Sequence, residues 1–350
     1  MRTEFVRVCD LEDPVGQLNI QHAAQIIRSG GLVIFPTETV YGLGGDATNP
    51  RAAHAIFEAK GRPSDNPLII HVASPEDAEE YTYTTPLYKV LADAFMPGPL
   101  TVIMKAKPCI PLTVRAGLDT VAVRCPAHPV ANALIKAAGV PIAAPSANLS
   151  GKPSPTCAQH IQFDMDGRVD MIIDGGACDV GLESTIVKIE DDSTLTLLRP
   201  GKVTLEDLRA IGLSIQVSPA VTCQLQQGEV VQSPGMKYRH YAPAAPLYLL
   251  RGDAEARYDY LVRREGNIGI LCYEEEMERF GALCGDERVF SLGLSDEPQE
   301  HAHRLFGLLN EVDRRQFDAI YAPLPSQEGI GLALYNRMIR AAAYQIIELD

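Results

Sequence analysis

Short apolar runs alternate with segments of helical spacing along residues 18–213. The runs are rich in Val, Ile and Leu and are bounded by Gly or Pro, which is typical of buried strands. We expect strands at 32–35, 68–72, 100–105, 119–124, 141–144, 171–174, 184–190 and 194–198. Segments that repeat apolar side chains every three or four residues predict helices at 18–29, 50–60, 75–82, 86–95, 128–138 and 204–210. This alternation indicates an α/β fold with flanking helices. It favours a mixed sheet over a purely parallel one.

Regular periodicity is lost over residues 214–245 and returns in a second pattern afterwards. Strands expected at 246–250, 267–273, 287–291 and 318–322 alternate with helices expected at 254–264, 298–315 and 328–344. This is the pattern of a smaller, Rossmann-like α/β domain, although its first strand lacks the G-x-G-x-x-G loop of a dinucleotide site. We therefore expect domains at 1–213 and 246–350, joined by residues 214–245.

The joining segment contains an unusual stretch, S-P-G-M-K-Y-R-H-Y-A-P at 233–243. It is either a plain interdomain linker or a strap that faces a ligand. Linkers use small or acidic polar residues more often than consecutive cationic and aromatic ones, which favours the strap.

A polar, glycine-rich loop follows the first of these strands, at residues 36–46. It places Thr37, Glu38, Thr39 and Tyr41 at the mouth of the strand, where ligands bind in open α/β sheets. The alternative is an ordinary connection that needs its glycines to turn.

Further polar groups stand at the ends of other elements. Lys60 and Arg62 end a helix, Arg124 ends an apolar strand, and Ser146 and Asn148 follow another. Taken singly, each has an ordinary structural explanation, such as a turn or a helix C-terminal cation. Taken together, with Ser184 and Arg199, they indicate a cleft for a polyanion such as a nucleoside triphosphate, in which electrostatic stabilisation is the catalytic device. Arg124 also has a second explanation, since a buried charge is tolerated where it meets a carboxylate.

Composition narrows the class of protein. The 350 residues suffice for about two domains, and 46 % hydrophobic with 22 % charged residues is typical of a globular protein. The sequence lacks an apolar run long enough for a membrane span, and the charged segment 1–14 does not resemble a signal peptide, so we expect a cytoplasmic protein. The net charge is −14, which argues against stable nucleic-acid binding. The eight cysteines form no C-x-x-C pair, so we expect reduced thiols and no protein-built metal site.

Several of these segments resemble a known family. P-T-E-T-V-Y-G-L-G (36–44), K-G-R-P-S-D-N-P-L (60–68), S-A-N-L-S-G (146–151), E-S-T-I-V (183–187) and L-R-P-G (198–201) are similar to the YrdC-type domain of L-threonylcarbamoyladenylate synthases. The strap at 233–243 and G-L-A-L-Y-N-R-M-I-R-A-A at 331–342 resemble the two-domain form of that family. The resemblance implies a YrdC-type twisted mixed sheet with flanking helices, followed by the smaller Rossmann-like domain.

It also implies a nucleotidyltransferase reaction. L-threonine, bicarbonate or CO₂, and ATP with Mg²⁺ are expected to give threonylcarbamoyl-AMP, with release of pyrophosphate and water. The product supplies the threonylcarbamoyl group for the modified adenosine next to the anticodon of tRNA, through downstream threonylcarbamoyl-transferase proteins.

The resemblance assigns roles to residues of this sequence, position by position. Lys60, Arg62 and Arg124 are the expected catalytic cations. Threonine is expected to contact Thr37, His71, Arg124 and Ser184. The ATP site is expected to contain Arg62, Asn66, Thr120, Ala144, Ser146, Asn148, Ser154, Arg199 and, in the strap, Tyr238. No side-chain ligand for the metal is identified.

Two alternatives come from other classes of protein. One is an RNA- or tRNA-binding protein that uses the same cleft without catalysis, against which the acidity of both halves of the chain counts. The other is a carbamoyl transferase acting on a protein thiol, for which the chain lacks the length and the C-x-x-C pairs expected of such enzymes.

Overall fold

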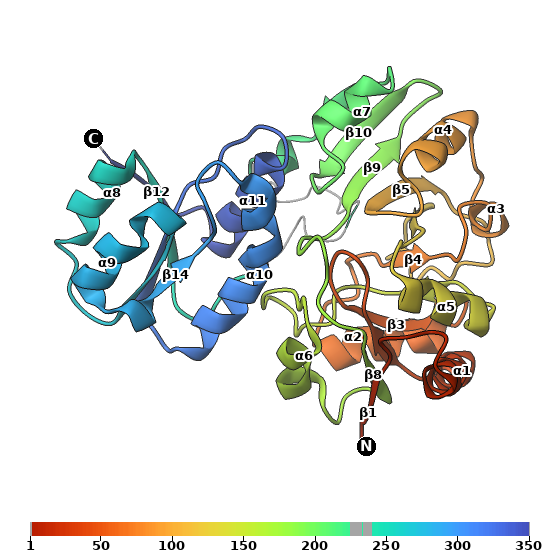
Figure 1. Ribbon diagram of the computed structural model, residues 1–350. Helices are drawn as coiled ribbons and strands as arrows, with labels where there is room; N and C mark the ends of the chain where they lie inside the picture. Colours follow the sequence, from red (N-terminus) through yellow and green to blue (C-terminus); the bar gives the residue numbers. More distant parts are fainter. Residues whose placement is uncertain (1, 225–232, 234–239, 350) are drawn as a thin grey trace. The chain divides into compact units, whose positions relative to one another are not determined.

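The computed structural model describes residues 2–224, 233 and 240–349. Its chain divides into two compact units, one of residues 1–150 with 154–237 and the other of residues 151–153 with 238–350 (Figure 1). Each unit is described separately below. The sequence-based boundaries at 213 and 246 remain predictions.

The first unit is built on one mixed sheet of eleven strands within the described residues. The strands are β1 (Glu4–Arg7), β2 (Val33–Phe35), β3 (Gly42–Asp46), β4 (Ile69–His71), β5 (Leu100–Lys105), β6 (Thr120–Arg124), β7 (Ile142–Ala143), β8 (Met171–Asp174), β9 (Thr185–Ile189), β10 (Thr194–Arg199) and β11 (Ser214–Val217). Their order across the sheet is β1-β8-β2-β3-β7-β4-β6-β5-β9-β10-β11. Parallel pairs such as β4 with β6 alternate with antiparallel pairs such as β5 with β6, so the mixed sheet expected from the sequence is confirmed.

The helices of this unit are α1 (Pro14–Arg28), α2 (Pro50–Lys60), α3 (Ala78–Tyr81), α4 (Pro86–Phe95), α5 (Pro129–Ala138), α6 (Ala158–Met165) and α7 (Leu205–Ala210), with a 3₁₀ turn η1 (Pro219–Val221). Local sequence explains their limits. At α2, the side chain of Asn49 accepts a hydrogen bond from the backbone of Arg51, Pro50 occupies the first turn, and Gly61 ends the helix in the left-handed conformation. This is the start and stop predicted for that helix.

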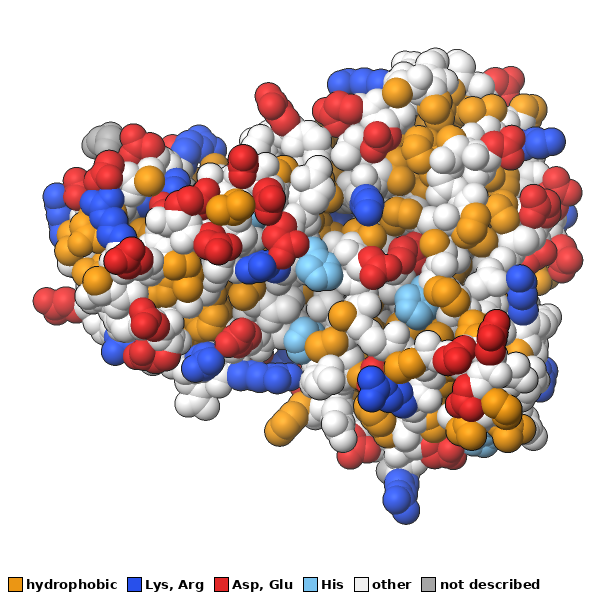
Figure 2. Space-filling view, viewed as in Figure 1, with side chains coloured by type: hydrophobic (Ala, Val, Ile, Leu, Met, Phe, Trp, Pro, Cys, Tyr) orange, Lys and Arg blue, Asp and Glu red, His pale blue; other side chains and the backbone are white. Residues whose placement is uncertain are grey.

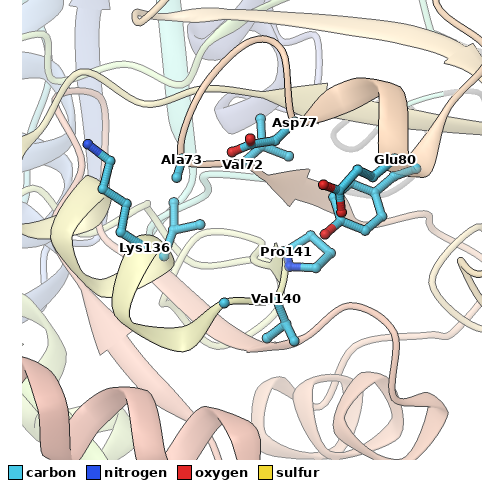
Figure 3. Close-up of a pocket in the computed structure, with 10 residues that line it drawn as sticks. Val72, Ala73, Asp77, Glu80, Lys136, Val140 and Pro141 are labelled. Carbon is cyan, nitrogen blue, oxygen red and sulfur yellow. The ribbon is translucent and has the colours of Figure 1, made fainter.

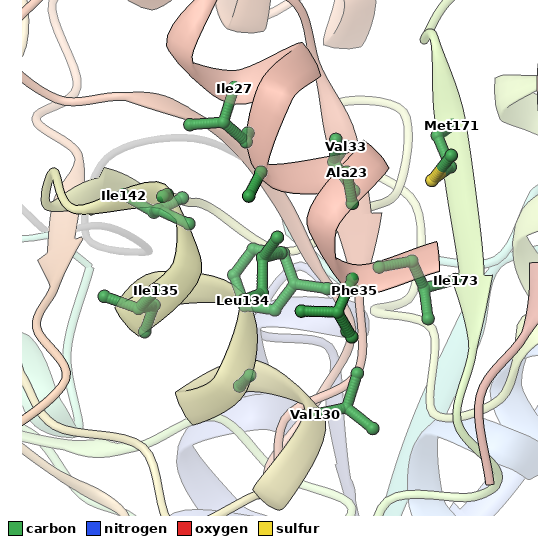
Figure 4. Close-up of a cluster of buried hydrophobic side chains, with 14 of the residues drawn as sticks. Ala23, Ile27, Val33, Phe35, Val130, Leu134, Ile135, Ile142, Met171 and Ile173 are labelled. Carbon is green, nitrogen blue, oxygen red and sulfur yellow. The ribbon is translucent and has the colours of Figure 1, made fainter. Parts of the chain in front are cut away.

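One hydrophobic core of the unit lies between α1, α5 and the sheet (Figure 4). Ile27 of α1 and Leu134 of α5 meet Phe35 of β2, and the three side chains are fully buried. Figure 4 also shows Met171 and Ile173 of β8 beside this cluster. This packing fixes β2, and with it the loop that carries the P-T-E-T segment.

The second unit contains a parallel sheet of five strands, again counted over the described part of the chain. They are β12 (Leu247–Arg251), β13 (Ile268–Cys272), β14 (Val289–Ser291), β15 (Ala319–Pro323) and β16 (Ile346–Glu348). The order is β14-β13-β15-β12-β16, and the connecting elements are α8 (Ala254–Leu261), η2 (Glu274–Glu276), α9 (Met277–Cys284), η3 (Asp286–Arg288), α10 (Pro298–Arg314) and α11 (Gly331–Ala341). The parallel βαβ arrangement expected from the sequence is confirmed, with a strand order that differs from the 3-2-1-4-5-6 of the Rossmann fold itself.

Candidate active site

Polar side chains form a row across the middle of the large sheet, at one register position. His71 of β4 pairs with Arg124 of β6, and Arg124 pairs with Thr101 of β5. Thr101 in turn pairs with Ile186 of β9, which lies opposite Arg199 of β10. Directly paired residues point to the same face of a sheet. The pairing therefore brings His71, Arg124 and Thr101 together although they are far apart in the sequence. Arg199 lies beyond a shift of register in β10 and joins them through Ser184, whose hydroxyl contacts that of Thr101.

Arg124 is the buried cation of this row, with 4 % of its surface exposed. Its Nη2 lies 2.7 Å from Oε1 of Glu38, which is also buried. The second oxygen of Glu38 accepts a hydrogen bond of 3.2 Å from the backbone N–H of Ala127. Arg124 Nε has no hydrogen-bond partner among the described residues. A half-satisfied buried guanidinium is costly unless a ligand completes its contacts.

His71 is a neutral member of the row. Its Nδ1–H donates to the carbonyl oxygen of Ile142 at 3.3 Å, and its ring meets Phe35 edge to face. Burial, reinforced by the positive charge of Arg124, lowers the pKa of His71 from 6.5 to about 3. The ring is therefore uncharged near neutral pH.

Ser184 is held by two neighbours. Its hydroxyl lies 2.7 Å from that of Thr101 and accepts a hydrogen bond of 3.1 Å from Nη2 of Arg199. Arg199 Nε also donates to the backbone oxygen of Ser184 at 3.0 Å. All three residues are buried. Arg199 thus fixes the backbone just before β9 as well as the Ser184 side chain.

Lys60 joins two of the motifs found in the sequence. Its ammonium group at the end of α2 donates to the backbone oxygens of Ser146 and Asn148, the latter at 2.5 Å. The Ser146 hydroxyl donates to Oδ1 of Asn148, also at 2.5 Å. Burial, with a further contribution from the charge of Arg62, holds the pKa of Lys60 well below its usual value. The K-x-R and S-x-N segments are therefore one structural unit.

Two more predicted residues are buried near this unit. Asn66 is fully buried, and neither its side-chain nitrogen nor its oxygen has a hydrogen-bond partner among the described residues. Such an amide is expected to bind a ligand or an ordered water. Arg62 donates to the backbone oxygens of Asn66 and Pro67 at 3.3 and 3.2 Å. Arg62 therefore also shapes the loop that presents Asn66.

Ser154 is also buried, and its hydroxyl donates to Oε1 of Glu183 at 2.7 Å. The charge of Glu183 acts on Lys60, opposing the decrease of the Lys60 pKa. The carboxylate thus connects the E-S-T segment with the K-x-R segment.

The remaining predicted residues are placed as follows. Thr37 is buried in a turn, where its hydroxyl donates to the Val40 oxygen at 2.6 Å and accepts from the backbone N–H groups of Thr39 and Val40. Because this uses the capacity of one hydroxyl, Thr37 offers a ligand mainly its backbone and methyl group. Ala144 is buried after β7, and Thr120 is partly exposed at the start of β6. Tyr238 lies outside the described residues.

Sequence reasoning named no role for Glu38, Thr101 or Glu183, which the structure places in direct contact with predicted residues. Glu38 and Glu183 lie inside the P-T-E-T and E-S-T segments, so the motifs contained them. Thr101 has no such signal, because its position inside an apolar strand is typical of an ordinary β-residue.

A separate hollow of about 240 Å³ lies elsewhere in the first unit (Figure 3). Asp77 and Glu80 lie across it from Lys136, and Val72 and Pro141 form part of its wall. Asp77 is already engaged, since its Oδ2 accepts from the backbone of Ser74. The hollow contains none of the predicted site residues.

Three features of the described residues bear on other classes of function. No group of three or more His, Cys, Asp and Glu side chains in the described ranges is arranged to hold a metal ion. In those ranges, none of the helices has the length and hydropathy needed to cross a membrane. Acidic and basic side chains are interspersed on the face shown in Figure 2, rather than gathered into one basic patch.

Comparison with known proteins gives matches over nearly the whole chain. The Sua5–YciO–YrdC family model, described as "Telomere recombination", matches residues 25–201. A second, described as "Threonylcarbamoyl-AMP synthase, C-terminal domain", matches residues 203–343.

Individual relatives match at full length. The threonylcarbamoyl-AMP synthase of Pyrococcus abyssi is 42 % identical, with 98 % of this chain and 99 % of the relative covered. That of Bacillus subtilis is 44 % identical, with 98 % of both chains covered. The solved structure of P. abyssi Sua5 in complex with L-threonine superposes with a TM-score of 0.90 at 40 % identity, covering 99 % of this chain and all of the other.

Proposed function

The chain belongs to the threonylcarbamoyl-AMP synthase family in its two-domain form, and on this premise we propose that it makes threonylcarbamoyl-AMP from L-threonine, bicarbonate or CO₂, and ATP. The observation that carries the proposal is the similarity to these synthases along nearly the entire length of both chains. The relative solved with L-threonine supports threonine as the amino-acid substrate. The enzyme is a nucleotidyltransferase that serves tRNA modification.

The reaction requires two bonds to form. The threonine amine attacks carbon dioxide and loses a proton, which gives a carbamate. A carbamate oxygen then attacks the α-phosphorus of ATP in line, and the bond from that phosphorus to the bridging oxygen breaks as pyrophosphate leaves. Charge stabilisation and positioning are the chief requirements for such a transfer.

We assign the threonine side of the site to the polar row of the sheet. Arg124 is the cation for the threonine carboxylate, because its guanidinium is buried and retains an unpartnered Nε among the described residues. Neutral His71 and the fixed Ser184 border it, and Thr37 orders the adjoining turn. Glu38 holds Arg124 in place through the ion pair between its Oε1 and Nη2 of the arginine.

We assign the ATP side to the unit formed by the K-x-R and S-x-N segments. Lys60 and Arg62 supply positive charge for the phosphates, and Asn66 supplies a buried amide without a partner among the described residues. The rest of this side comprises Thr120, Ala144, Ser146, Asn148, Ser154, Arg199 and, outside the described residues, Tyr238. These roles rest on the family pattern together with the contacts given above.

Magnesium is proposed to arrive with ATP rather than at a site built by the protein. The two carboxylates of this region are already used, Glu38 by Arg124 and Glu183 by Ser154. The donor set of the described residues therefore does not fit a bound Mg²⁺ by itself, whereas phosphate oxygens and water are ligands that Mg²⁺ commonly retains. The product is proposed to pass to a transferase that acts on tRNA.

The decisive experiment measures pyrophosphate release with ATP, L-threonine and bicarbonate, leaving out each in turn. The proposal requires release that depends on all three. Release supported by L-valine as well as by L-threonine changes the substrate assignment. No release from folded protein in the complete mixture contradicts the proposed activity.

A further inference from the structure

The second unit contains a hollow of about 250 Å³ at the carboxyl ends of its strands. Tyr273 follows β13, Leu292 follows β14 and Pro325 follows β15, and all three line the hollow. Pro298 and Gly331, the first residues of α10 and α11, line it as well. The hollow belongs to this unit alone, and the reaction proposed above makes no use of it.

The topology of the sheet explains why a hollow forms at this place. The neighbouring strands β13 and β15 send their connections in opposite directions across the sheet. The chain leaves β13 toward β14 at one edge, and it leaves β15 toward β16 at the other. The two loops therefore diverge, and the crevice between diverging loops is where open α/β sheets bind ligands.

The walls of the hollow suit a flat, largely apolar molecule. The rings of Tyr273 and His301 lie 5.1 Å apart between centroids, tilted by 35°. Leu292, Leu334 and Met338 supply apolar surface. A few polar groups in a predominantly apolar wall are typical of small-molecule sites.

The polar atoms of the hollow are mainly hydrogen-bond acceptors. His301 Nε2 donates to the backbone oxygen of Leu294 at 2.6 Å, which leaves Nδ1 as the ring nitrogen that can accept a hydrogen bond from a ligand. His301 is only 7 % exposed. The Ser295 hydroxyl donates to Oε1 of Glu275 at 2.9 Å, which also leaves it lone pairs to offer. Glu328 adds an exposed carboxylate at the rim.

The same region does not suit a phosphate group. The first backbone N–H groups of α11 are taken, since Gly331 donates to the Glu328 oxygen at 2.9 Å and Ala333 donates to the Ile330 oxygen at 3.0 Å. Anion sites at helix N-termini depend on free N–H groups. The carboxylates of Glu275 and Glu328 add negative charge close by. The favoured ligand is therefore uncharged and brings N–H donors.

We propose that this hollow binds a neutral, donor-bearing heteroaromatic molecule of the nucleoside class. The ring of the ligand lies against Tyr273, and its N–H groups donate to Nδ1 of His301 and to the acceptors at the rim. This site is distinct from the ATP side of the first unit, and it does not depend on the proposed synthase activity.

The test uses the full chain labelled with ¹³C at its methionine methyl groups and follows the Met338 resonance by NMR. Adenosine and adenosine 5′-monophosphate are the probes, because they differ by one phosphate. Adenosine is expected to shift Met338 saturably, and the monophosphate to bind about tenfold more weakly.

Two variants complete the test. Leu334→Phe fills the hollow and should abolish the Met338 response, with Val262→Phe as the control because Val262 is exposed in the same unit. Glu328→Lys changes only an exposed side chain and should reverse the preference toward the monophosphate, which keeps the proposal testable if Leu334→Phe fails to fold. An unshifted Met338 in the unmodified chain at millimolar adenosine overturns the proposal, as does tighter binding of the monophosphate there.

Discussion

Arg62 combines two tasks, because its guanidinium lies at the proposed phosphate site and also donates to the backbone of the Asn66 loop. We expect Arg62→Ala to lower pyrophosphate release by about two orders of magnitude or more, since it removes charge stabilisation of the transferred group. A cation exposed at the surface would contribute little to stability. The observed carbonyl contacts predict instead a modest loss of about 1 kcal/mol.

Arg51→Ala is the control for this change, since Arg51 is an exposed arginine of α2, the helix that ends two residues before Arg62. Urea unfolding of both variants separates the effect on stability from the effect on turnover. Activity of Arg62→Ala equal to that of Arg51→Ala would contradict the role given to Arg62.

Glu38 is expected to act through Arg124 rather than on the substrate. Glu38→Gln leaves the Arg124 charge buried without its counter-ion, and breaking a buried pair in this way costs about 3–5 kcal/mol. The freed guanidinium should also raise KM for threonine more than it lowers kcat. Steady-state kinetics at varied threonine concentration separates the effect on KM from the effect on kcat, with Glu58→Gln as a control at an exposed glutamate. An unchanged KM in Glu38→Gln would contradict the positioning role.

The lowered pKa of His71 predicts that the folded protein becomes less stable in acid. Its pKa is lowered in the fold from 6.5 to about 3, so between these pH values the unfolded chain binds a proton that the folded chain does not. The stability due to neutral His71 is therefore complete above pH 6.5 and falls by up to about 1.4 kcal/mol per pH unit below it.

His71→Gln, which keeps a donor for the Ile142 oxygen, should show a shallower loss in urea midpoints measured from pH 7 to pH 4. His54→Gln, at an exposed histidine, should follow the unmodified chain. Equal slopes in all three proteins would show that His71 is protonated more readily than its burial predicts.

At the level of whole elements, much of the fold could be predicted from the sequence. The limits of α4, β5 and β8 agree with prediction, because Pro residues or sharp changes in polarity mark their ends. β3 was missed, since its glycines were interpreted as a loop. They serve packing instead: a Cβ on Gly44 would lie 2.6 Å from the ring of Phe35. β1, α6, β11, α9 and β16 are short and weakly patterned, and they were missed as well.

The candidate active site, too, could be predicted only in part from the sequence. The motifs contained nearly all of the residues that meet in it, but they did not state the pairings. The sequence showed that Arg124 required an anion or a carboxylate, and only the tertiary structure shows that its partner is Glu38, from the loop after β2, and that His71 and Thr101 are its neighbours in the sheet. Side-chain partners depend on tertiary contacts that hydrophobic periodicity does not encode.

Gly201 controls the approach of β10 to the start of β9. A Cβ there would lie 2.5 Å from the backbone nitrogen of Thr185 and 2.8 Å from the oxygen of Glu183. Gly201→Ala should therefore displace the segment that carries Ser184 and Arg199, cost about 1–3 kcal/mol and reduce activity. Gly307→Ala is the control, because a Cβ at that position of α10 meets nothing within 4 Å. An active, equally stable Gly201→Ala protein would contradict the account.

The net charge of the whole molecule bears on whether it binds nucleic acid. The net charge of −14 predicts no saturable binding of tRNA, although the product serves a tRNA modification. Fluorescence anisotropy of labelled tRNA between about 50 and about 200 mM salt tests this, because binding through phosphate contacts weakens steeply over that range. Saturable binding with a steep salt dependence would revive the RNA-binding alternative.

The order of strands in the large sheet has a kinetic consequence. β1 pairs with β8, whose residues come 167 positions later in the chain (Glu4 with Met171), whereas the residues that pair near the candidate site are 53 positions apart between β4 and β6 (His71 with Arg124) and 85 apart between β5 and β9 (Thr101 with Ile186). Because such non-local pairings require long loops to close before contacts compensate for them, they form slowly. The β1–β8 pairing should therefore be among the last parts of the first unit to assemble. A chain interrupted before β10 would contain the K-x-R, S-x-N and E-S-T segments and still lack Arg199, and with it the side chain that fixes Ser184.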